Sequence, residues 1–426
     1  MGLLLFFLFM VLLLSGVPIA VAIGLSSVVV IWLADLGIAV VSPNFYSGIA
    51  KFQLLAIPLF IFAGFLFERC GISERLVRFA NLLVGRKKGS LAIVAVLVCV
   101  FFGGISGSGP ADAAAIGAIL IPAMIRDGYD RGFVAALIAG AGSTAIIVPV
   151  SIALIIYGAL TNTSITTLFA AGAIPGALAG LCLILPAWWI SRKRGYGSRT
   201  SMESDMGLFQ AFREAFWGLM APGIILGGLY GGVFTPTEAA VVAVFYGLIL
   251  GFFLYRTLTL RALYEILVEA SNASAVVMLI ITFAGLFSWT ASTLGAMDAI
   301  SASLLGISDN PYVVLLIINL ILFFAGMLID AISIFYIFIP IFLPIMARFG
   351  WDPIWFGIMM TFNLAIGQFT PPVAVNLYVT THLAEIPVEE TFKAVIPFIL
   401  AMLAGLVLLA LFPGITLFLP RLFGMS

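Results

Sequence analysis

Charged residues are scarce in this chain of 426 residues: 9% are charged and 63% are hydrophobic. Typical soluble domains carry about 25% charged residues, so a deficit of this size predicts a chain that folds in lipid. The net charge is zero, which argues against a nucleic-acid-binding protein. The three cysteines, Cys70, Cys99 and Cys182, show neither metal-ligand spacing nor a disulfide framework. The single histidine, His382, cannot build a metal centre by itself.

Long apolar runs are candidates for membrane helices, because about 20 apolar residues cross a bilayer. They cover residues 3–33, 217–234, 239–255, 311–329 and 394–420. The first run is too long for the apolar part of a secretory signal and has no basic residues before it, so we expect it to remain in the protein. The segments between the runs are too short to fold alone, which excludes an ATPase or a large enzyme domain.

Basic residues gather in three segments, and such segments mark the cytoplasmic side of a membrane protein. They are 68–89 (Arg69, Arg75, Arg78, Arg86, Lys87, Lys88), 191–199 (Arg192, Lys193, Arg194, Arg199) and the stretch with Arg256 and Arg261. Residues 292–310 contain no Lys or Arg. We therefore expect the three basic segments inside, with 75–88 as an amphipathic arm on the inner surface, and 292–310 outside. Counting crossings places the N-terminus inside and the C-terminus outside.

An internal repeat is visible at a constant offset (344 − 122 = 222 residues). The pairs are Pro122 and Pro344, Gly128 and Gly350, Asp130 and Asp352, Pro149 and Pro371, and Pro175 and Pro397. With a short gap, Asp112 also pairs with Asp330 (330 − 112 = 218). The first copy follows a basic loop and the second a loop without basic residues, so we expect the copies to insert in opposite senses. Inverted repeats with interrupted helices are typical of many secondary transporters.

The sequence GGISGSGPAD (103–112) interrupts two apolar runs. Irregular backbone in a membrane is tolerated only inside protein or around a water-filled cavity. We therefore predict a re-entrant hairpin over 90–125 with its tip at 103–110. The repeat predicts a second one over 311–346 with its tip at 324–330. A broken helix follows each hairpin, at 139–151 and 363–376, where Pro149, Pro371 and Pro372 leave backbone carbonyls free.

Oxygen atoms at these breaks predict cation sites, one for each hairpin tip and its broken helix. Carbonyls at helix ends, with the hydroxyls of Ser106 and Ser108, suit a hard cation such as sodium. Gln368, Thr370 and Asn376 add polar groups to the second site. Asp112 and Asp330 lie at membrane depth, where a carboxylate is a functional candidate. The alternative is that each aspartate only caps the helix after its tip.

Three motifs carry a family resemblance: GISGSGPADAAAIG (104–117), IPAMIRDGYDRGFVAA (121–136) and GQFTPPVAVNLYV (367–379). Over nearly its whole length the chain resembles the large membrane (M) subunit of tripartite ATP-independent periplasmic (TRAP) transporters. The resemblance implies an all-α integral membrane protein of the bacterial inner membrane, not an enzyme. Its fold would be an inverted-repeat elevator-type secondary transporter with two re-entrant hairpins and two broken helices.

The resemblance also implies partners and a reaction. A periplasmic substrate-binding (P) protein delivers an organic acid, such as sialic acid or a C4-dicarboxylate, and a small four-helix membrane (Q) subunit supports the scaffold. Sodium ions drive import, and no organic cofactor takes part. The scaffold would comprise 1–89 and 166–310, the two halves of the transport domain 90–165 and 311–387, and a C-terminal membrane helix 388–426.

Carried over by position, the resemblance assigns two sets of site residues. The sodium ligands would be Ser106, Ser108, Ala145, Val148, Val150, Gly326, Asp330, Gly367, Thr370 and Pro372. The substrate, between the two tips, would contact Gly107, Asp112, Ser151, Pro371 and Asn376. The chain departs from the family at Ala145, where glycine is common, and at Val150, where proline is common. Both departures leave a backbone carbonyl in place.

Other interpretations stay open. A stand-alone sodium/anion elevator carrier would work without a binding protein. An intramembrane protease could use Ser106, in a G-x-S-G pattern, with His382 as its base, or Asp112 and Asp330 as an aspartyl dyad. An ion channel also uses broken helices and carbonyl rings. The inverted repeat has no role in a protease and is unusual for a channel.

Overall fold

The computed structural model describes residues 1–85, 88–197 and 207–425, and every regular element in these ranges is a helix. The first copy of the repeat contains α1 (Gly2–Leu14), α2 (Ile19–Leu33), α3 (Val41–Ile49), α4 (Ala56–Arg69), α5 (Ile72–Val84), α6 (Ser90–Ser106), α7 (Gly109–Arg126), α8 (Arg131–Ser143), α9 (Ile152–Thr161) and α10 (Ile165–Arg194). The second contains α11 (Leu208–Tyr230), α12 (Pro236–Ile249), α13 (Leu260–Thr293), α14 (Ala296–Ile307), α15 (Pro311–Gly326), α16 (Ala331–Phe349), α17 (Pro353–Gly367), α18 (Val375–Ala384) and α19 (Phe392–Leu411), followed by α20 (Pro413–Leu422). Short 3-10 turns cover Ile38–Val40, Phe52–Leu55, Thr144–Ile146 and Val388–Thr391, and a π-helical turn covers Leu250–Leu254.

Seven of the described helical segments are long and apolar enough to cross a membrane. They are Phe52–Arg69, Gly109–Arg126, Ile165–Arg194, Pro236–Leu254, Leu260–Thr293, Ala331–Phe349 and Val388–Leu411. The run 3–33 forms two helices, α1 and α2, that pack against each other. The segment 388–426 contains the short helix α20 after a segment long enough to cross a membrane.

The internal repeat is confirmed by equivalent places in the structure. Pro122 and Pro344 both lie inside the second arm of a hairpin, α7 and α16. Asp130 and Asp352 both cap the next helix, accepting hydrogen bonds from Phe133 N and Ile354 N at 2.9 and 2.7 Å. A carboxylate at this position satisfies amides that have no partner within the helix.

The pairing of Asp112 with Asp330 was wrong. Asp330 is the residue directly before α16, whereas Asp112 lies within α7. The residue directly before α7 is Ser108, and it stands at the constant offset from Asp330 (330 − 108 = 222). The two helices therefore begin at equivalent places with different capping residues, because the offset between the copies has no gap here.

The three basic segments meet at one end of the molecule. Arg69 pairs with Glu265 at 3.1 Å, Arg78 pairs with Glu214 at 3.7 Å, and Gly89 N donates to Tyr196 O at 3.2 Å. Arg86, Lys87 and Arg199 lie outside the described residues. The described part of the arm, α5, buries one face against α6 and α11, as an amphipathic helix does.

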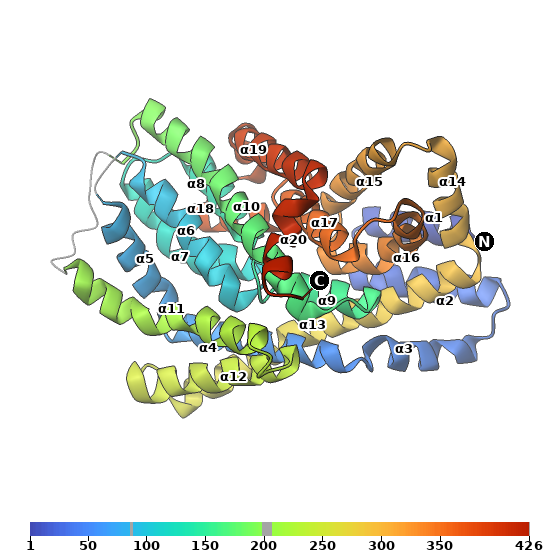
Figure 1. The fold of residues 1–426 in the computed structure, drawn as a ribbon, viewed down its shortest axis with the longest axis horizontal. Coiled ribbons are helices and arrows are strands. Elements are labelled where there is room, and N and C mark those ends of the chain that lie inside the picture. The colour runs from blue at the N-terminus through green and yellow to red at the C-terminus, as the bar shows by residue number, and fades with distance from the viewer. Residues whose placement is uncertain (86–87, 198–206, 426) are drawn as a thin grey trace.

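The N-terminus lies at the other end, beside α14 (Figure 1). A Cβ built on Gly2 would lie 2.5 Å from the Cβ of Ala296, within the segment 292–310 that has no basic residues. The expectation that the N-terminus shares a side with the basic segments was therefore wrong. The run 3–33 does not cross the molecule once, because α1 and α2 pack against each other as a hairpin. The C-terminus lies beside α11: Phe423 stacks on Tyr230 at 5.4 Å.

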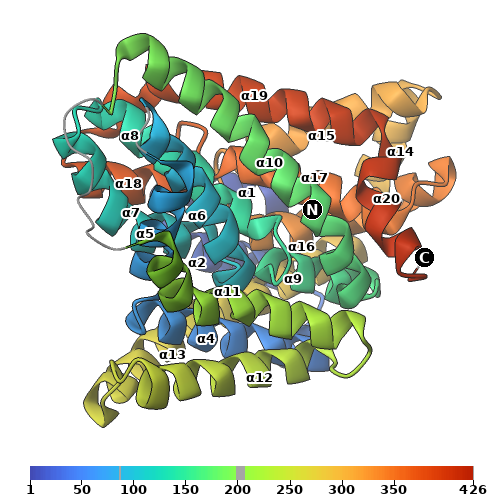
Figure 2. The same ribbon diagram turned by 60° about the vertical axis from the view of Figure 1, so that its left-hand side comes forward.

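The two hairpins enter the molecule from opposite ends. The first, α6 and α7, starts beside the basic segments, and the second, α15 and α16, starts beside α14 (Figure 1, Figure 2). This arrangement is the one expected of two copies in opposite senses. It brings the hairpin tips, 107–108 and 327–330, toward the interior, where the breaks of α8–α9 and α17–α18 also lie.

Candidate ion and substrate site

The tip of the first hairpin is a sharp turn of two residues. Helix α6 ends at Ser106, Gly107 has a left-handed conformation with φ +64°, and the extended residue Ser108 directly precedes α7. A positive φ favours glycine. Pro110 lies in the first turn of α7, where its missing amide costs no hydrogen bond.

This first tip lies directly on the first broken helix. Ile152 N donates to Gly107 O at 3.4 Å, and a Cβ on Gly107 would overlap the Val150 carbonyl oxygen. On the next turn of α6, a Cβ on Gly103 would lie 2.8 Å from the Cα of Ala145. Backbone therefore meets backbone here, and glycine is the residue that allows it.

Ser106 and Asp112 are bonded to each other behind this tip. The Ser106 hydroxyl donates to Asp112 Oδ1 and accepts from Ser108 N at 3.2 Å. Asp112 is fully buried, and its Oδ2 has no hydrogen-bond partner among the described residues. The Asp112 carboxyl group thus adds its oxygen atoms to a site otherwise made of hydroxyl and carbonyl oxygens. It lies inside the first turn of α7 and does not cap the helix.

The second tip repeats the backbone contact. A Cβ on Gly367, at the end of α17, would lie 2.5 Å from the carbonyl carbon of Gly326, and Val373 N donates to Met327 O at 3.2 Å. Asp330 caps α16, accepting from Ser333 N at 3.0 Å and from Ser333 Oγ at 2.6 Å. Asp330 therefore caps the helix after its tip, as the alternative interpretation of the two aspartates expected. Its half-buried carboxylate still leaves a charge at the tip.

The second broken helix also contacts the first tip. A Cβ on Gly109 would overlap Gln368 Oε1 and lie 3.2 Å from Asn376 Nδ2. Asn376 is fully buried and donates to Ala139 O on α8 at 3.1 Å. Residues 368–376 thus lie between the two tips. The sequence missed this role of Gly109, although Gly109 is the last glycine of GGISGSGPAD.

The site residues assigned by resemblance fall into two groups in space. Ser106, Gly107, Ser108, Asp112, Ala145, Val148, Val150 and Ser151 lie at the first tip and first break, and Gly326, Asp330, Gly367, Thr370, Pro371, Pro372 and Asn376 lie at the second. Some hydroxyls already have partners within their breaks. Ser151 Oγ donates to Ile146 O at 2.6 Å, and Thr370 Oγ1 donates to Ile366 O at 2.6 Å.

A cavity of about 120 Å³ opens on the first tip from outside the hairpin. Glu68 of α4 lines it together with Ser106 and Ser108, and α13 closes the far side with Ala273 and Val277. Glu68 is not among the site residues predicted from the sequence. An acidic residue at the end of an apolar stretch was the available signal.

The protease interpretations find no support in these contacts. The Ser106 hydroxyl donates to Asp112 and not to His382, the base that the serine-protease interpretation requires. His382 lies in the last turn of α18. Asp330 uses both carboxylate oxygens on Ser333, and Asp112 is bonded to Ser106, so each aspartate serves its own hairpin.

Comparison with known proteins decides the family. Residues 6–415 match the family described as "Tripartite ATP-independent periplasmic transporter, DctM component". The chain belongs to this TRAP transporter family. The resemblance seen in the three motifs is thereby confirmed, and the chain is a multi-pass membrane protein of the large permease type.

Several relatives are similar over most of the chain. It is 36% identical to the C4-dicarboxylate TRAP transporter large permease protein DctM of Rhodobacter capsulatus, covering all of both chains. It is 39% identical to the sialic acid TRAP transporter large permease protein SiaM of Vibrio cholerae, over 97% of this chain and 96% of that one. It is 40% identical to the isethionate TRAP transporter permease protein DctMQ of Oleidesulfovibrio alaskensis, over 96% of this chain but 65% of that one.

A solved structure shares the fold. The crystal structure of the YdaH transporter of Alcanivorax borkumensis superposes with a TM-score of 0.66, over 88% of this chain and 87% of that one. The sequences are 16% identical, so the likeness concerns the arrangement of helices.

Proposed function

We propose that this chain is the translocating subunit of a sodium-coupled symporter that imports an organic acid. The observation that carries the proposal is the meeting of two hairpin tips with two broken helices. Helix ends within the fold expose backbone carbonyls and amides that have no partners inside the helix. Such ends bind small cations and the anionic groups of substrates in secondary transporters.

In this proposal one sodium ion binds at each tip. At the first, oxygen atoms come from Ser106, Ser108 and the carbonyls at Ala145, Val148 and Val150. At the second, they come from Gly326, Asp330, Gly367, Thr370 and Pro372. Hard cations prefer oxygen ligands, and the Asp112 and Asp330 carboxylates balance the positive charge of the two ions.

The substrate binds between the tips, beside residues 368–376. In this proposal the space is bordered by Gly107, Ser151, Pro371 and Asn376, together with Gln368 and Gly109, which lie against each other. Asp112 has a different role here from the one that the sequence suggested. Its carboxylate would repel an anionic substrate, so it acts on sodium through Ser106.

Import would follow an elevator motion with two protein partners. The hairpins and broken helices would move as a transport domain against the helices of 1–89 and 166–310. The named relatives transport a C4-dicarboxylate, sialic acid and isethionate, which supports an organic acid as substrate. The longer relative DctMQ supports a small Q subunit as a partner, and the family description supports a periplasmic binding protein.

Uptake by proteoliposomes tests the proposal. The vesicles contain this chain and its Q subunit, and the binding protein loaded with labelled sialic acid, C4-dicarboxylate or isethionate is added outside. We expect uptake that requires the binding protein and stops when the sodium gradient is collapsed. Uptake without the binding protein would instead support a stand-alone carrier. Uptake that persists without a sodium gradient would refute sodium coupling.

A further inference from the structure

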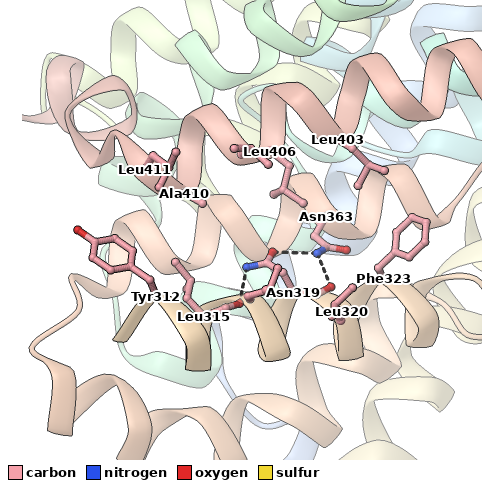
Figure 3. Close-up of a pocket in the computed structure, with 12 residues that line it drawn as sticks. Tyr312, Leu315, Asn319, Leu320, Phe323, Asn363, Leu403, Leu406, Ala410 and Leu411 are labelled. Carbon is pink, nitrogen blue, oxygen red and sulfur yellow. Dashed lines mark hydrogen bonds between the residues drawn. The ribbon is translucent and has the colours of Figure 1, made fainter. Parts of the chain in front are cut away.

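An apolar groove lies on the second copy of the repeat, away from both tips. It has a volume of about 400 Å³ and lies between α15, α17 and α19. Its walls are hydrocarbon side chains, chiefly Leu315, Leu316, Leu320, Phe323, Leu403 and Leu406 (Figure 3). Helix α19 belongs to a segment apolar enough to cross the membrane, so the groove faces the lipid region.

The floor of the groove offers no free hydrogen-bond donor. Asn363 Nδ2 donates to the backbone oxygen and to Oδ1 of Asn319, each at 2.9 Å (Figure 3). Asn319 Nδ2 donates to Leu315 O at 2.9 Å and contacts Met359 Sδ at 3.4 Å. Both amides thus direct their N–H groups into the protein. The floor of the groove therefore offers an organic anion no amide donor, and the hydroxyl of Tyr312 lies at the end that the groove shares with the second cavity.

In the first copy of the repeat, the helices equivalent to α15 and α19 pack closely together. A Cβ on Gly180 of α10 would lie 3.0 Å from the side chain of Val100 of α6. At the constant offset, Gly180 corresponds to Met402 (402 − 180 = 222) and Val100 to Leu322. The longer Met402 side chain is fully buried. Helices α15 and α19 do not pack closely against each other, as α6 and α10 do, and the groove lies between them.

The groove continues into a second cavity of about 320 Å³ at the ends of the helices. The two cavities share Tyr312, Leu315, Ala410 and Leu411. Trp351 and Asp352 line the second one, and Trp351 stacks on Phe349 at 5.2 Å. Tyrosine and tryptophan concentrate where a membrane meets water. The pair of cavities therefore has an apolar part at membrane depth and an aromatic, acidic part at its rim.

We propose that these two cavities bind one membrane phospholipid. An acyl chain fills the groove, and an ammonium headgroup lies beside Asp352 and the aromatic rings. A void that no atoms fill forfeits dispersion contacts along its walls, and a hydrocarbon chain restores them. A protein helix is too large, since ten residues of a helix ~10 Å wide and ~15 Å long occupy about 1,200 Å³. The site does not depend on which ion or acid is transported.

Photolabelling in lipid nanodiscs tests the proposal on the whole membrane complex. The probe is phosphatidylethanolamine with a diazirine on its acyl chain, and adducts are mapped by mass spectrometry. We expect adducts concentrated on α15 and α19. Ala410→Phe, on the groove wall, should reduce them severalfold, whereas Ala404→Phe, on the exposed face of the same helix, should not. If Ala410→Phe does not fold, Val407→Phe, which also lies on the groove wall, replaces it as the test variant.

Three results would overturn the proposal. Labelling spread evenly over every exposed apolar face would show only the surrounding bilayer. Labelling of the groove that appears only when the Q subunit is left out would show that protein covers it. A phosphatidylglycerol probe with the same acyl chain should label less, since its headgroup has no ammonium; equal labelling would refute the headgroup assignment.

Discussion

Gly326 and Gly367 touch through their backbones, at the point where the second hairpin meets the second broken helix. A Cβ on Gly367 would lie 2.6 Å from the Gly326 carbonyl oxygen and 2.7 Å from its Cα. The neighbouring atoms belong to backbone, so they cannot turn aside as a side chain would. The contact fixes the position of the Gly326 and Gly367 carbonyls relative to each other, and these carbonyls are proposed sodium ligands.

Gly367→Ala should therefore separate the second tip from its broken helix. We expect a loss of about 1–3 kcal/mol in folding stability, the usual cost of overpacking a filled interior, and weaker sodium binding. Thermal unfolding in detergent and sodium-dependent uptake measure the two effects. Gly414→Ala is the control, because a Cβ there meets nothing within 4 Å. A Gly367→Ala protein with unchanged stability would show that the contact is not as close as described.

Ser106→Ala should weaken the first sodium site without unfolding the protein. It removes the hydroxyl that is bonded to Asp112 and, in our proposal, one ligand of the ion. We expect the half-saturating sodium concentration to rise about tenfold, which corresponds to ~1.4 kcal/mol of binding free energy. The control is Ser303→Ala, which removes an exposed hydroxyl bonded to its own helix at Ala299 O. Unchanged sodium dependence would remove Ser106 from the site.

Asp330→Asn separates charge from helix capping. Asparagine can still accept the hydrogen bond from Ser333 N, so the cap survives, but the negative charge is lost. We expect correct assembly with strongly reduced sodium-driven uptake. Asp130→Asn is the matched control, since Asp130 caps α8 in the same way through Phe133 N. If Asp330→Asn transports normally, the carboxylate has only a structural role.

Lys51 joins the two parts that move relative to each other in the elevator proposal. Its Nζ donates to Ala159 O at 2.7 Å, at the carboxyl end of α9, where a cation is also favoured by the helix dipole. Lys51→Met should remove this bond and change the rate of uptake while leaving the sodium dependence alone. Lys393→Met, at an exposed position of α19, is the control. An uptake rate equal to wild type would show that the bond does not restrain the motion.

Local sequence determined the helices and their interruptions. The glycines and serines at 103–109 signal the end of an apolar helix: α6 continues to Ser106, and the tip forms at Gly107 and Ser108. The constant offset predicted that Asp130 and Asp352 occupy equivalent places, and both cap a helix. An aspartate before a helix bonds to amides only two or three residues away. Such short-range effects need no information from the rest of the chain.

Tertiary structure alone decided which groups meet. The sequence paired Asp112 with Asp330 by residue type, but the packed structure bonds Asp112 to Ser106 and makes Ser108 the counterpart of Asp330. It also decided that Gly109 lies against Gln368, that Glu68 faces the first tip, and that the N-terminus lies beside Ala296. These contacts join residues far apart in the chain, and they depend on how whole helices pack in three dimensions. Hydrophobic pattern and helix propensity act along one helix at a time, so they do not contain this information.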